Sequence, residues 1–265
     1  MERVVEIEKE FALASVQTGL KRSFLAYASP DAVIFRPKPV LAMPVLNKDP
    51  DDDQGTKLDW WPAMGAISRA GDLALSVGPW VLTDDSGKAQ QRYYGYYATV
   101  WKKQPDGAWK FVIDGAGAIL DGKPSRQRGG PVLVLPVASE RRATTAQAAL
   151  IEVRLSEASL AASSEHDARK AIASVLDDKA WLMGSRTEPA EGKFGWRAEL
   201  GRRPSKLALT YLGGDASSSG DLAYTYGLVD SLDPSSAWRD ASYLHVWQRQ
   251  KGRWRLIFQG IKSRR

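Results

Sequence analysis

The pattern of apolar and polar positions in the first part of the chain predicts mainly helices. Apolar side chains recur at spacings of three and four over residues 2–19, as on one face of an amphipathic helix, and Gly19 marks its end. A second, shorter helix is expected over residues 21–28. The apolar run at residues 32–35 is typical of a short strand, and residues 57–68 are expected to form another short helix.

An antiparallel sheet is predicted between Gly71 and Gly115. Three segments rich in β-branched and aromatic residues can form its strands: residues 73–80, 91–103 and 108–119. The sequence Pro105-Asp106-Gly107 between the last two segments is a strong signal for a hairpin turn. The pattern therefore indicates a three-stranded meander.

The register of this hairpin decides which side chains share a face. We expect Gln104 to face Gly107 across the turn, and we assign the face that carries Tyr94 and Tyr96 to the inside of the fold. The opposite, outer face then carries Tyr97, Thr99, Trp101 and Asp114. Both faces are apolar, so both should be covered, one by helices and the other by a second sheet.

A weaker copy of this pattern fills the C-terminal half. The sequence GDLAYTYGLV from Gly220 matches GDLALSVGPW from Gly71, and a hairpin pattern again follows and ends at Gly260. Helices are expected from Thr144 or Thr145 to about residue 162 and then over residues 165–176. Strands are expected at residues 180–183, 207–212, 222–229, 241–249 and 254–261. Such a long repeat indicates a duplicated domain, because solenoid repeats are much shorter.

The repeat divides the chain into two domains and a linker. We predict one domain at residues 1–120, a linker at 121–143 and a divergent copy of the domain at 144–265. The ends of the linker are polar and rich in Gly and Pro, but its middle, residues 132–135, is apolar. We expect this middle part to lie as an edge strand or in a groove between the halves.

Composition and charge exclude some classes of function. The chain has 265 residues and includes ten Trp, nine Tyr and six Phe, enough for two hydrophobic cores. It has no Cys, so disulfides, thiolate catalysis and Cys-ligated metals are excluded. The net charge is +6, but no nucleic-acid-binding motif accompanies it, and we expect no nucleic-acid partner.

Other patterns argue against a membrane span, a metal site and a cofactor site. No apolar run approaches the roughly 20 residues of a membrane span. The charged start of the chain lacks a signal peptide, so a cytoplasmic protein is expected, unless a signal has been removed from an exported one. The run DPDDDQG in the loop at residues 47–57 lacks the glycine position and the final Glu of a calcium loop. We expect no metal and no cofactor.

Three strings in the first half carry a resemblance to a known superfamily. YASPDAVIFRP, ISRAGDLALSVGPW and YGYYATVWKKQPDGAWKFVID resemble the nuclear-transport-factor-2-like (NTF2-like) superfamily, in its SnoaL-like branch of domains of unknown function. The resemblance covers nearly all of residues 2–118 and, more faintly, residues 146–262. It implies an α+β fold of two cone-shaped domains in tandem. Each cone would pack N-terminal helices on a curved antiparallel sheet, with a pocket in its mouth.

The resemblance also bears on assembly and activity. Members often pair through the outer face of the sheet, so a tandem chain can make that pair internally, and a further homo-oligomer stays open. The superfamily includes isomerases, cyclases and dehydratases as well as domains that only bind ligands or assemble. At the position of the isomerases' catalytic aspartate this chain has Arg36, which cannot abstract a proton at neutral pH. Residues 2–19 also lack the isomerases' tyrosine.

The candidate site residues all lie in the first half. Arg36 can hold an anionic ligand through its planar guanidinium group, and the simpler interpretation is a surface arginine. Tyr94 and Tyr96 are expected to point into the pocket, and Trp61 and Trp80 to stand at its rim, although all four can instead be core residues. His245 is expected to be a hydrogen-bonded buried or interface residue rather than a general base.

Three functions stay open at this point. The first is a protein whose first half binds a small ligand, anionic or partly apolar, while the second half serves mainly as its internal partner. The second is an enzyme of the cyclase, dehydratase or isomerase kind with an unidentified base. The third is a structural interaction module. A cone filled by side chains counts against binding and catalysis, whereas a carboxylate or His245 inside an open pocket, with a perturbed pKa, favours an enzyme.

Overall fold

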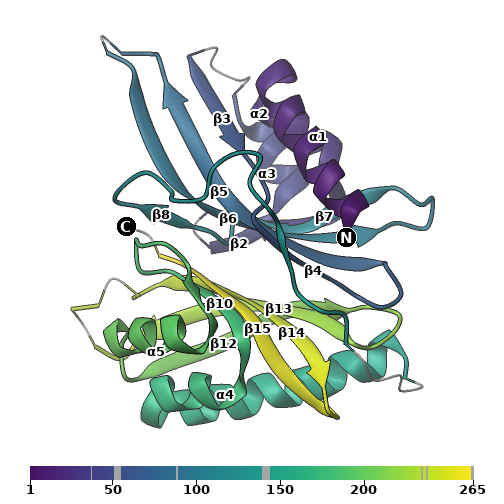
Figure 1. Cartoon of the computed structure of the whole chain (residues 1–265), viewed down its shortest axis with the longest axis vertical. Coiled ribbons are helices and arrows are strands. Elements are labelled where there is room, and N and C mark those ends of the chain that lie inside the picture. The colour runs from purple at the N-terminus through teal and green to yellow at the C-terminus, as the bar shows by residue number, and fades with distance from the viewer. Residues whose placement is uncertain are drawn as a thin grey trace.

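The chain forms two helix-covered sheets that lie face to face. The computed structural model describes residues 1–36, 38–50, 55–87, 89–138, 144–233, 235–236 and 238–263. One sheet comes mainly from the first half and has the strand order β2-β1-β7-β6-β5-β4-β9, with β3 also pairing with β5 and β8 with β6. The other has the order β11-β10-β15-β14-β13-β12. Helices cover the side of each sheet that faces away from the other sheet (Figure 1), so the predicted α+β class is confirmed.

Most of the elements predicted for the first half are observed, but a strand and a helix over residues 38–48 were not predicted, and the strand expected at residues 108–119 is divided in two. Its helices are α1 (Glu2–Thr18), α2 (Leu20–Tyr27) and α3 (Ala42–Lys48). Its strands are β1 (Ala28–Arg36), β2 (Lys38–Leu41), β3 (Thr56–Trp60), β4 (Met64–Ile67), β5 (Leu73–Asp84), β6 (Gln91–Lys103), β7 (Trp109–Asp114) and β8 (Ala118–Leu120). Gly19 separates the first two helices with a positive φ of 94°. Residues 51–54, which hold most of the calcium-like run, lie outside the described residues.

The predicted helix at residues 57–68 is wrong. This segment forms β3 and β4, both antiparallel to β5, with Trp60 opposite Trp80. Pro62, in the break between the two strands, has no N–H group to give to a ladder. The buried Trp60 is held by long-range contacts with α1, and a short apolar run cannot by itself distinguish a strand from a helix.

The predicted register of the hairpin is also wrong, by one residue. The backbone N–H of Gln104 donates to the carbonyl of Ala108, so three residues form the loop instead of two. Trp101 therefore lies opposite Phe111, and a bulge precedes it. Because side chains alternate between the faces of a sheet, a shift of one residue changes which side chains of the two strands share a face.

The assignment of inner and outer faces is reversed as well. Tyr97 and Trp101 pack against the helices of the first half, together with Trp60 and Phe111. Tyr96 belongs to the core between the two sheets, and Tyr94 packs against that core. Most of the large aromatic side chains of this sheet thus lie under the helices, while the sheet-to-sheet face carries small and aliphatic residues such as Val77, Ala98 and Val100 beside Tyr96.

The second half repeats the arrangement. It comprises α4 (Ala146–Val175), α5 (Gly192–Arg202), β10 (Leu176–Met183), β11 (Ala190–Glu191), β12 (Leu207–Ala216), β13 (Leu222–Ser231), β14 (Ala241–Gln250) and β15 (Arg253–Lys262). The Thr145 hydroxyl caps α4 by accepting from the N–H of Ala148, 3.1 Å away. The two expected helices are continuous across a kink at Asp167.

The linker joins the first sheet. Its apolar middle forms β9 (Leu133–Val134), which pairs in parallel with β4. The prediction of an edge strand is therefore confirmed. In the described part of the chain, no helix combines the length and the apolar character that crossing a membrane requires.

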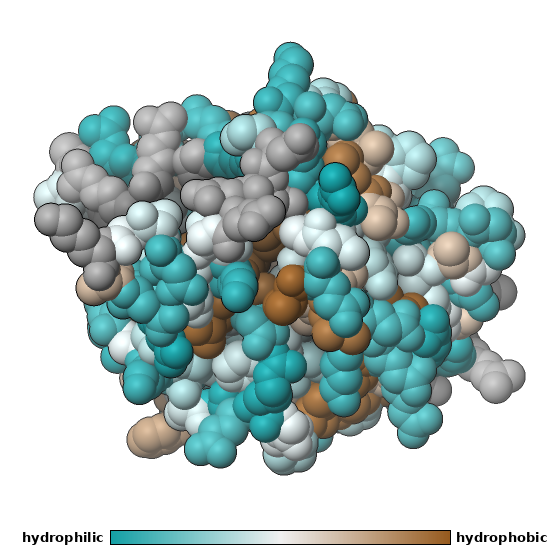
Figure 2. Space-filling view, turned by 90° about the horizontal axis from the view of Figure 1, so that it is seen from above, coloured by the Kyte–Doolittle hydropathy of each residue, from teal (hydrophilic) through white to brown (hydrophobic). Residues whose placement is uncertain are grey.

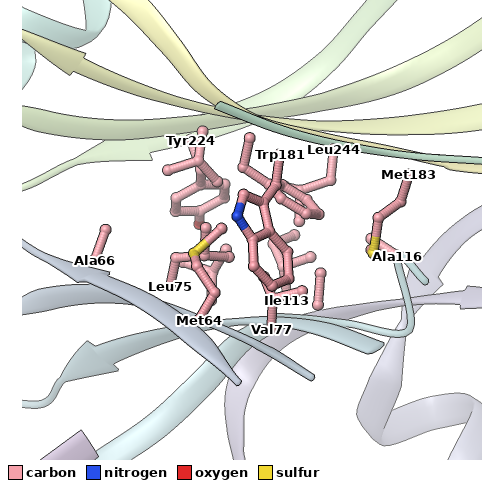
Figure 3. Close-up of a cluster of buried hydrophobic side chains, with 14 of the residues drawn as sticks. Met64, Ala66, Leu75, Val77, Ile113, Ala116, Trp181, Met183, Tyr224 and Leu244 are labelled. Atoms are coloured by element: carbon pink, nitrogen blue, oxygen red, sulfur yellow. The ribbon is translucent and has the colours of Figure 1, made fainter. Parts of the chain in front are cut away.

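One hydrophobic core joins the two halves. Figure 3 shows that side chains from both sheets interdigitate in it, with Trp181 of β10 reaching toward Met64 and Val77 of the first half. Trp181 is fully buried, and its indole N–H has no hydrogen-bond partner among the described residues. The outer face of the first sheet is thus covered by the second half of the same chain.

Trp181→Ala should lower the free energy of unfolding by about 3–5 kcal/mol, because it leaves a large cavity in this core. Trp181→Phe should cost clearly less, since it also removes an unpaired N–H group. Urea titrations would measure both. Phe194→Ala is the control, because that side chain is 93% exposed and should change stability by less than about 0.5 kcal/mol. Equal costs for Trp181→Ala and Phe194→Ala would contradict this account of the core.

Candidate functional site

A cavity of about 280 Å³ lies between the helices and the sheet of the first half. Aromatic and aliphatic side chains form most of its wall, including Phe11 and Phe24 from the helices and Trp60 and Trp80 from the strands. From above, the surface of the molecule is mostly hydrophilic, with apolar side chains visible only in small areas (Figure 2). The cavity is therefore a mostly apolar space within a polar exterior.

Part of the cavity is polar. Thr99, Asp114 and Lys262 line it, and the Thr99 hydroxyl donates to the Asp114 carboxylate. Asp114 is only 7% exposed. Burial raises the pKa of Asp114 to about 6, although the Thr99 hydroxyl, the N–H of Gly115 and the charge of Lys262 each act to lower it. The cavity thus contains a carboxylate that changes its charge close to neutral pH.

Glycines beside Asp114 let the backbone turn and pack closely at the end of β7. Gly115 has a φ of 80°, and a Cβ on Gly117 would lie 1.7 Å from the carbonyl oxygen of Tyr96. The chain therefore leaves the sheet after β7 and rejoins it at β8. The end of β15 comes close to this gap, because a Cβ on Gly260 would meet the carbonyl oxygen of Ala116 at 2.4 Å. This close approach places Lys262 of the second half at the cavity of the first.

A second carboxyl group lies behind the aromatic wall. Glu8 of α1 is completely buried and accepts from the indole N–H groups of Trp60 and Trp101, at 2.7 and 2.8 Å. Burial raises its pKa to about 7, and the charge of Asp114 acts in the same direction. Glu8 therefore fixes the wall residue Trp60 and the neighbouring Trp101 to the first helix, and its charge is coupled to that of Asp114 in the cavity.

The second half has the same framework with different side chains. Glu157 of α4 corresponds to Glu8 and accepts from the indole N–H of Trp247 at 2.8 Å. His245 pairs with Gln259 on adjacent strands, in the place of Thr99 beside Asp114. The predicted hydrogen-bonded, buried His245 is confirmed, but it faces the helices and not the outside.

A buried polar network occupies the interior of the second half. His245 Nδ1 lies 2.7 Å from Glu157, which can only accept, so the other ring nitrogen accepts from the amide of Gln259 at 2.7 Å. The amide oxygen of Gln259 accepts from Arg203, which also donates to Glu199 at 2.8 Å. These side chains are almost completely buried, and His245 and Gln259 take the positions that Thr99 and Asp114 have in the cavity wall of the first half.

Three of the five predicted site residues line the cavity. Arg36 lies at its exposed mouth, where its guanidinium forms an ion pair with Asp49 at 2.6 Å. Trp80 forms part of the wall. Tyr96 also lines the cavity, but its hydroxyl donates to Glu188 of the second half, 2.6 Å away, because its side chain faces the other sheet.

The other two predicted residues lie elsewhere. Trp61 packs under the linker, where its indole N–H donates to the carbonyl of Arg126 at 3.2 Å and the guanidinium of Arg128 stands over its ring. Tyr94 packs against the core between the sheets. The structure therefore brings together Arg36, Trp80 and Tyr96, and their role in binding stays a prediction.

Sequence reasoning found Arg36 but missed the other two charged residues of the cavity, Asp114 and Lys262. Asp114 was placed on the outer face, although the glycine-rich sequence after it, GAG, signals a break in the sheet. Lys262 comes from the other half, and no local pattern points to it. Among the described residues, no three His, Asp or Glu side chains cluster as a metal site.

Comparisons with known proteins were made with both the sequence and the structure. No family model matches the chain, and no curated protein matches it. An NTF2-like protein of unknown function from Pseudomonas putida is 16% identical, with a TM-score of 0.37, over 45% of this chain and 89% of that one. The association domain of C. elegans CaMKII is 13% identical, with a TM-score of 0.36, over 43% and 92%.

A third match is an NTF2-like protein with a cystatin-like fold from Novosphingobium aromaticivorans. It is 14% identical, with a TM-score of 0.36, over 46% of this chain and 82% of that one. The first and third of these proteins are described as NTF2-like, the name of the superfamily that the sequence resembles. They concern the fold alone, and the branch within the superfamily stays a prediction.

The raised pKa of Glu8 should make stability depend on pH. The folded protein keeps a proton on Glu8 that the unfolded chain releases above its ordinary pKa of 4.5. The free energy of unfolding should therefore fall as pH rises from 4.5 to about 7, by about 3 kcal/mol from this group, and then become level. Asp114 acts in the same direction, but only up to about pH 6.

Urea titrations at several pH values would check this dependence. Glu8→Gln should be less stable overall, because one indole N–H loses its acceptor, and it should lose most of the slope between pH 6 and 7. Glu10→Gln, an exposed change on the same helix, should keep the wild-type slope. A Glu8→Gln variant with the full wild-type slope would show that Glu8 does not hold this proton.

Proposed function

We propose that the first half binds a small, mostly apolar molecule in its cavity. The observation that carries this proposal is the difference between the halves: the helix-covered interior is hollow in the first and filled by a polar network in the second. Cores are normally packed without voids of this size, so a cavity kept in one copy of a duplicated fold supports a binding role.

The dimensions and lining of the cavity set the class of ligand. A cavity of about 150 Å³ holds a benzene molecule, so about 280 Å³ suits one ring with a short side chain or two fused rings. Phe11, Phe24 and Trp80 supply flat apolar contacts. Thr99 and Asp114 supply hydrogen-bonding groups that can orient the ligand. In this proposal residues 144–265 form the domain that covers the outer face of the first sheet.

A thermal-shift titration with toluene, indole and benzamide tests the proposal. At least one of these probes should raise the Tm of the wild type in a saturable way, by several degrees near 100 times its Kd. Leu82→Trp, which adds bulk to the wall, should abolish the rise. Thr83→Trp is the matched control, because its side chain points to the other face of the same strand. An equal rise in Leu82→Trp would place the binding elsewhere, and no rise with any probe would contradict the proposal.

A second candidate function is proton transfer. Asp114 is the observation that favours it, because a buried carboxylate with a pKa of about 6 is well suited to act as a general base near neutral pH. In such a reaction Asp114 would take a proton from a carbon next to a carbonyl group of the ligand, leaving an enolate. Return of a proton to that or another carbon would complete the exchange or the isomerisation.

Deuterium exchange into phenylacetone in D₂O, followed by NMR, tests this second function. The wild type should accelerate exchange next to the carbonyl, with a rate that rises through about pH 6 as Asp114 ionises and then levels off. Asp114→Asn should reduce the accelerated rate by about 100-fold or more. Asp178→Asn, an exposed change in the second half, should leave it unchanged. Equal rates in Asp114→Asn and wild type would exclude Asp114 as the base.

A further inference from the structure

The cavity of the first half contains a cation from the second. Lys262 lies at the end of β15 and lines the cavity beside Asp114, at the gap left by Gly115 and Gly117. It also lines a smaller hollow, next to Ile119 of β8. The cavity is therefore incomplete without the second half.

The opposite charges of Lys262 and Asp114 attract each other, but the two side chains do not form a direct ion pair. Burial lowers the pKa of Lys262, and Asp114 counteracts this effect. Among the described residues, no carboxylate forms an ion pair with Lys262 within 4 Å, so its ammonium group is free to donate to a ligand. A lysine ammonium has three donors and no acceptor, whereas an ionised carboxylate only accepts.

We propose that Lys262 and Asp114 together form a binding site for a neutral ligand group that carries a hydrogen-bond acceptor beside a donor, as a primary amide does. This inference rests on the proposed binding function of the cavity. Lys262 would donate to the carbonyl oxygen, and the carboxylate of Asp114 would accept from the N–H or O–H group. The second half would thus contribute to recognition as well as to packing.

The other charged groups around the site also favour a neutral ligand group. The carboxyl group of Glu8 lies behind the wall and adds negative charge as it ionises near pH 7. Arg36, at the mouth, is already paired with Asp49. A ligand carboxylate would therefore meet one free cation and two acidic groups, whereas a neutral amide leaves the charges balanced.

The interior of the second half already contains a primary amide in a comparable position between a cation and a hydrogen-bond acceptor. The amide of Gln259, which stands where Asp114 stands in the first half, lies between a cation and an acceptor. Its oxygen accepts from Arg203, and its N–H group donates to His245. In the first half the cavity lies beside the cation Lys262 and the acceptor Asp114. A ligand amide there would likewise accept a hydrogen bond from a cation and donate one to an acceptor.

Isothermal titration with phenylacetamide, phenylacetate, phenethylamine and toluene tests the inference. Phenylacetamide should bind the wild type more tightly than the acid or the amine. Lys262→Met should weaken phenylacetamide by about tenfold or more, as expected for the loss of a hydrogen bond to a charged group. It should change toluene binding less than about twofold. Lys179→Met, an exposed change in the second half, should affect neither probe.

The variant Asp114→Asn provides a second, independent test of the inference. With the carboxylate gone, Lys262 is no longer balanced, and the preference should reverse so that phenylacetate binds more tightly than phenylacetamide. Unchanged phenylacetamide binding in Lys262→Met, or tightest binding of phenylacetate by the wild type, would overturn the inference. If not even toluene binds the wild type, the proposed function itself fails, and the two failures are therefore distinguishable.

Discussion

The sheet of the first half is apolar on both faces, and both faces must be kept from water. Tyr97 and Trp101 point toward the helices, while Val77, Ala98 and Val100 point the other way. A sheet of this kind is stable only with a cover on each side. The second half of the chain supplies the second cover, and this contact also brings the end of β15 to the gap after β7. The contact between the two sheets therefore both covers the first sheet and places Lys262 of the second half at the cavity.

The two halves share a hydrogen bond between the first helix and the sheet but differ in the side chains that surround it. In both halves a buried glutamate on the first helix accepts from the indole of a tryptophan on the central hairpin, Glu8 with Trp101 and Glu157 with Trp247. Such a bond fixes the helix to the sheet at one register. Around this fixed point the first half carries few polar side chains and keeps a cavity, whereas the second carries Arg203 and a connected network.

Much of the fold could be predicted from periodicity and repeat, because these signals are local or recur in the chain. The incorrect predictions of secondary structure and register have identifiable physical causes. Residues 57–68 form strands because Trp60 is held by Glu8, a contact between residues far apart in sequence. The hairpin register depends on whether its loop has two or three residues, which Pro-Asp-Gly alone does not decide.

The candidate site was less predictable than the fold. A sheet with two apolar faces does not reveal from its sequence which face meets the helices, so Tyr96 was placed inside and Asp114 outside. Arg36 and Trp80 do line the cavity, Arg36 from the end of β1 and Trp80 from the middle of β5, opposite Trp60. Lys262 could not be found from any local pattern, since its position depends on how one half packs on the other.

The linker strand β9 has one more consequence, which concerns association between molecules. Without it β4 would be an open edge, whose free N–H and C=O groups can pair with the edge of another molecule and start aggregation. Leu133 and Val134 cover part of that edge. Pro131 and Pro136 lie close to them on either side and have no N–H group to give to a ladder, so the strand stays short. The segment that joins the two copies thus also ends the sheet. Removing it would separate the halves and expose the unpaired, aggregation-prone edge of β4.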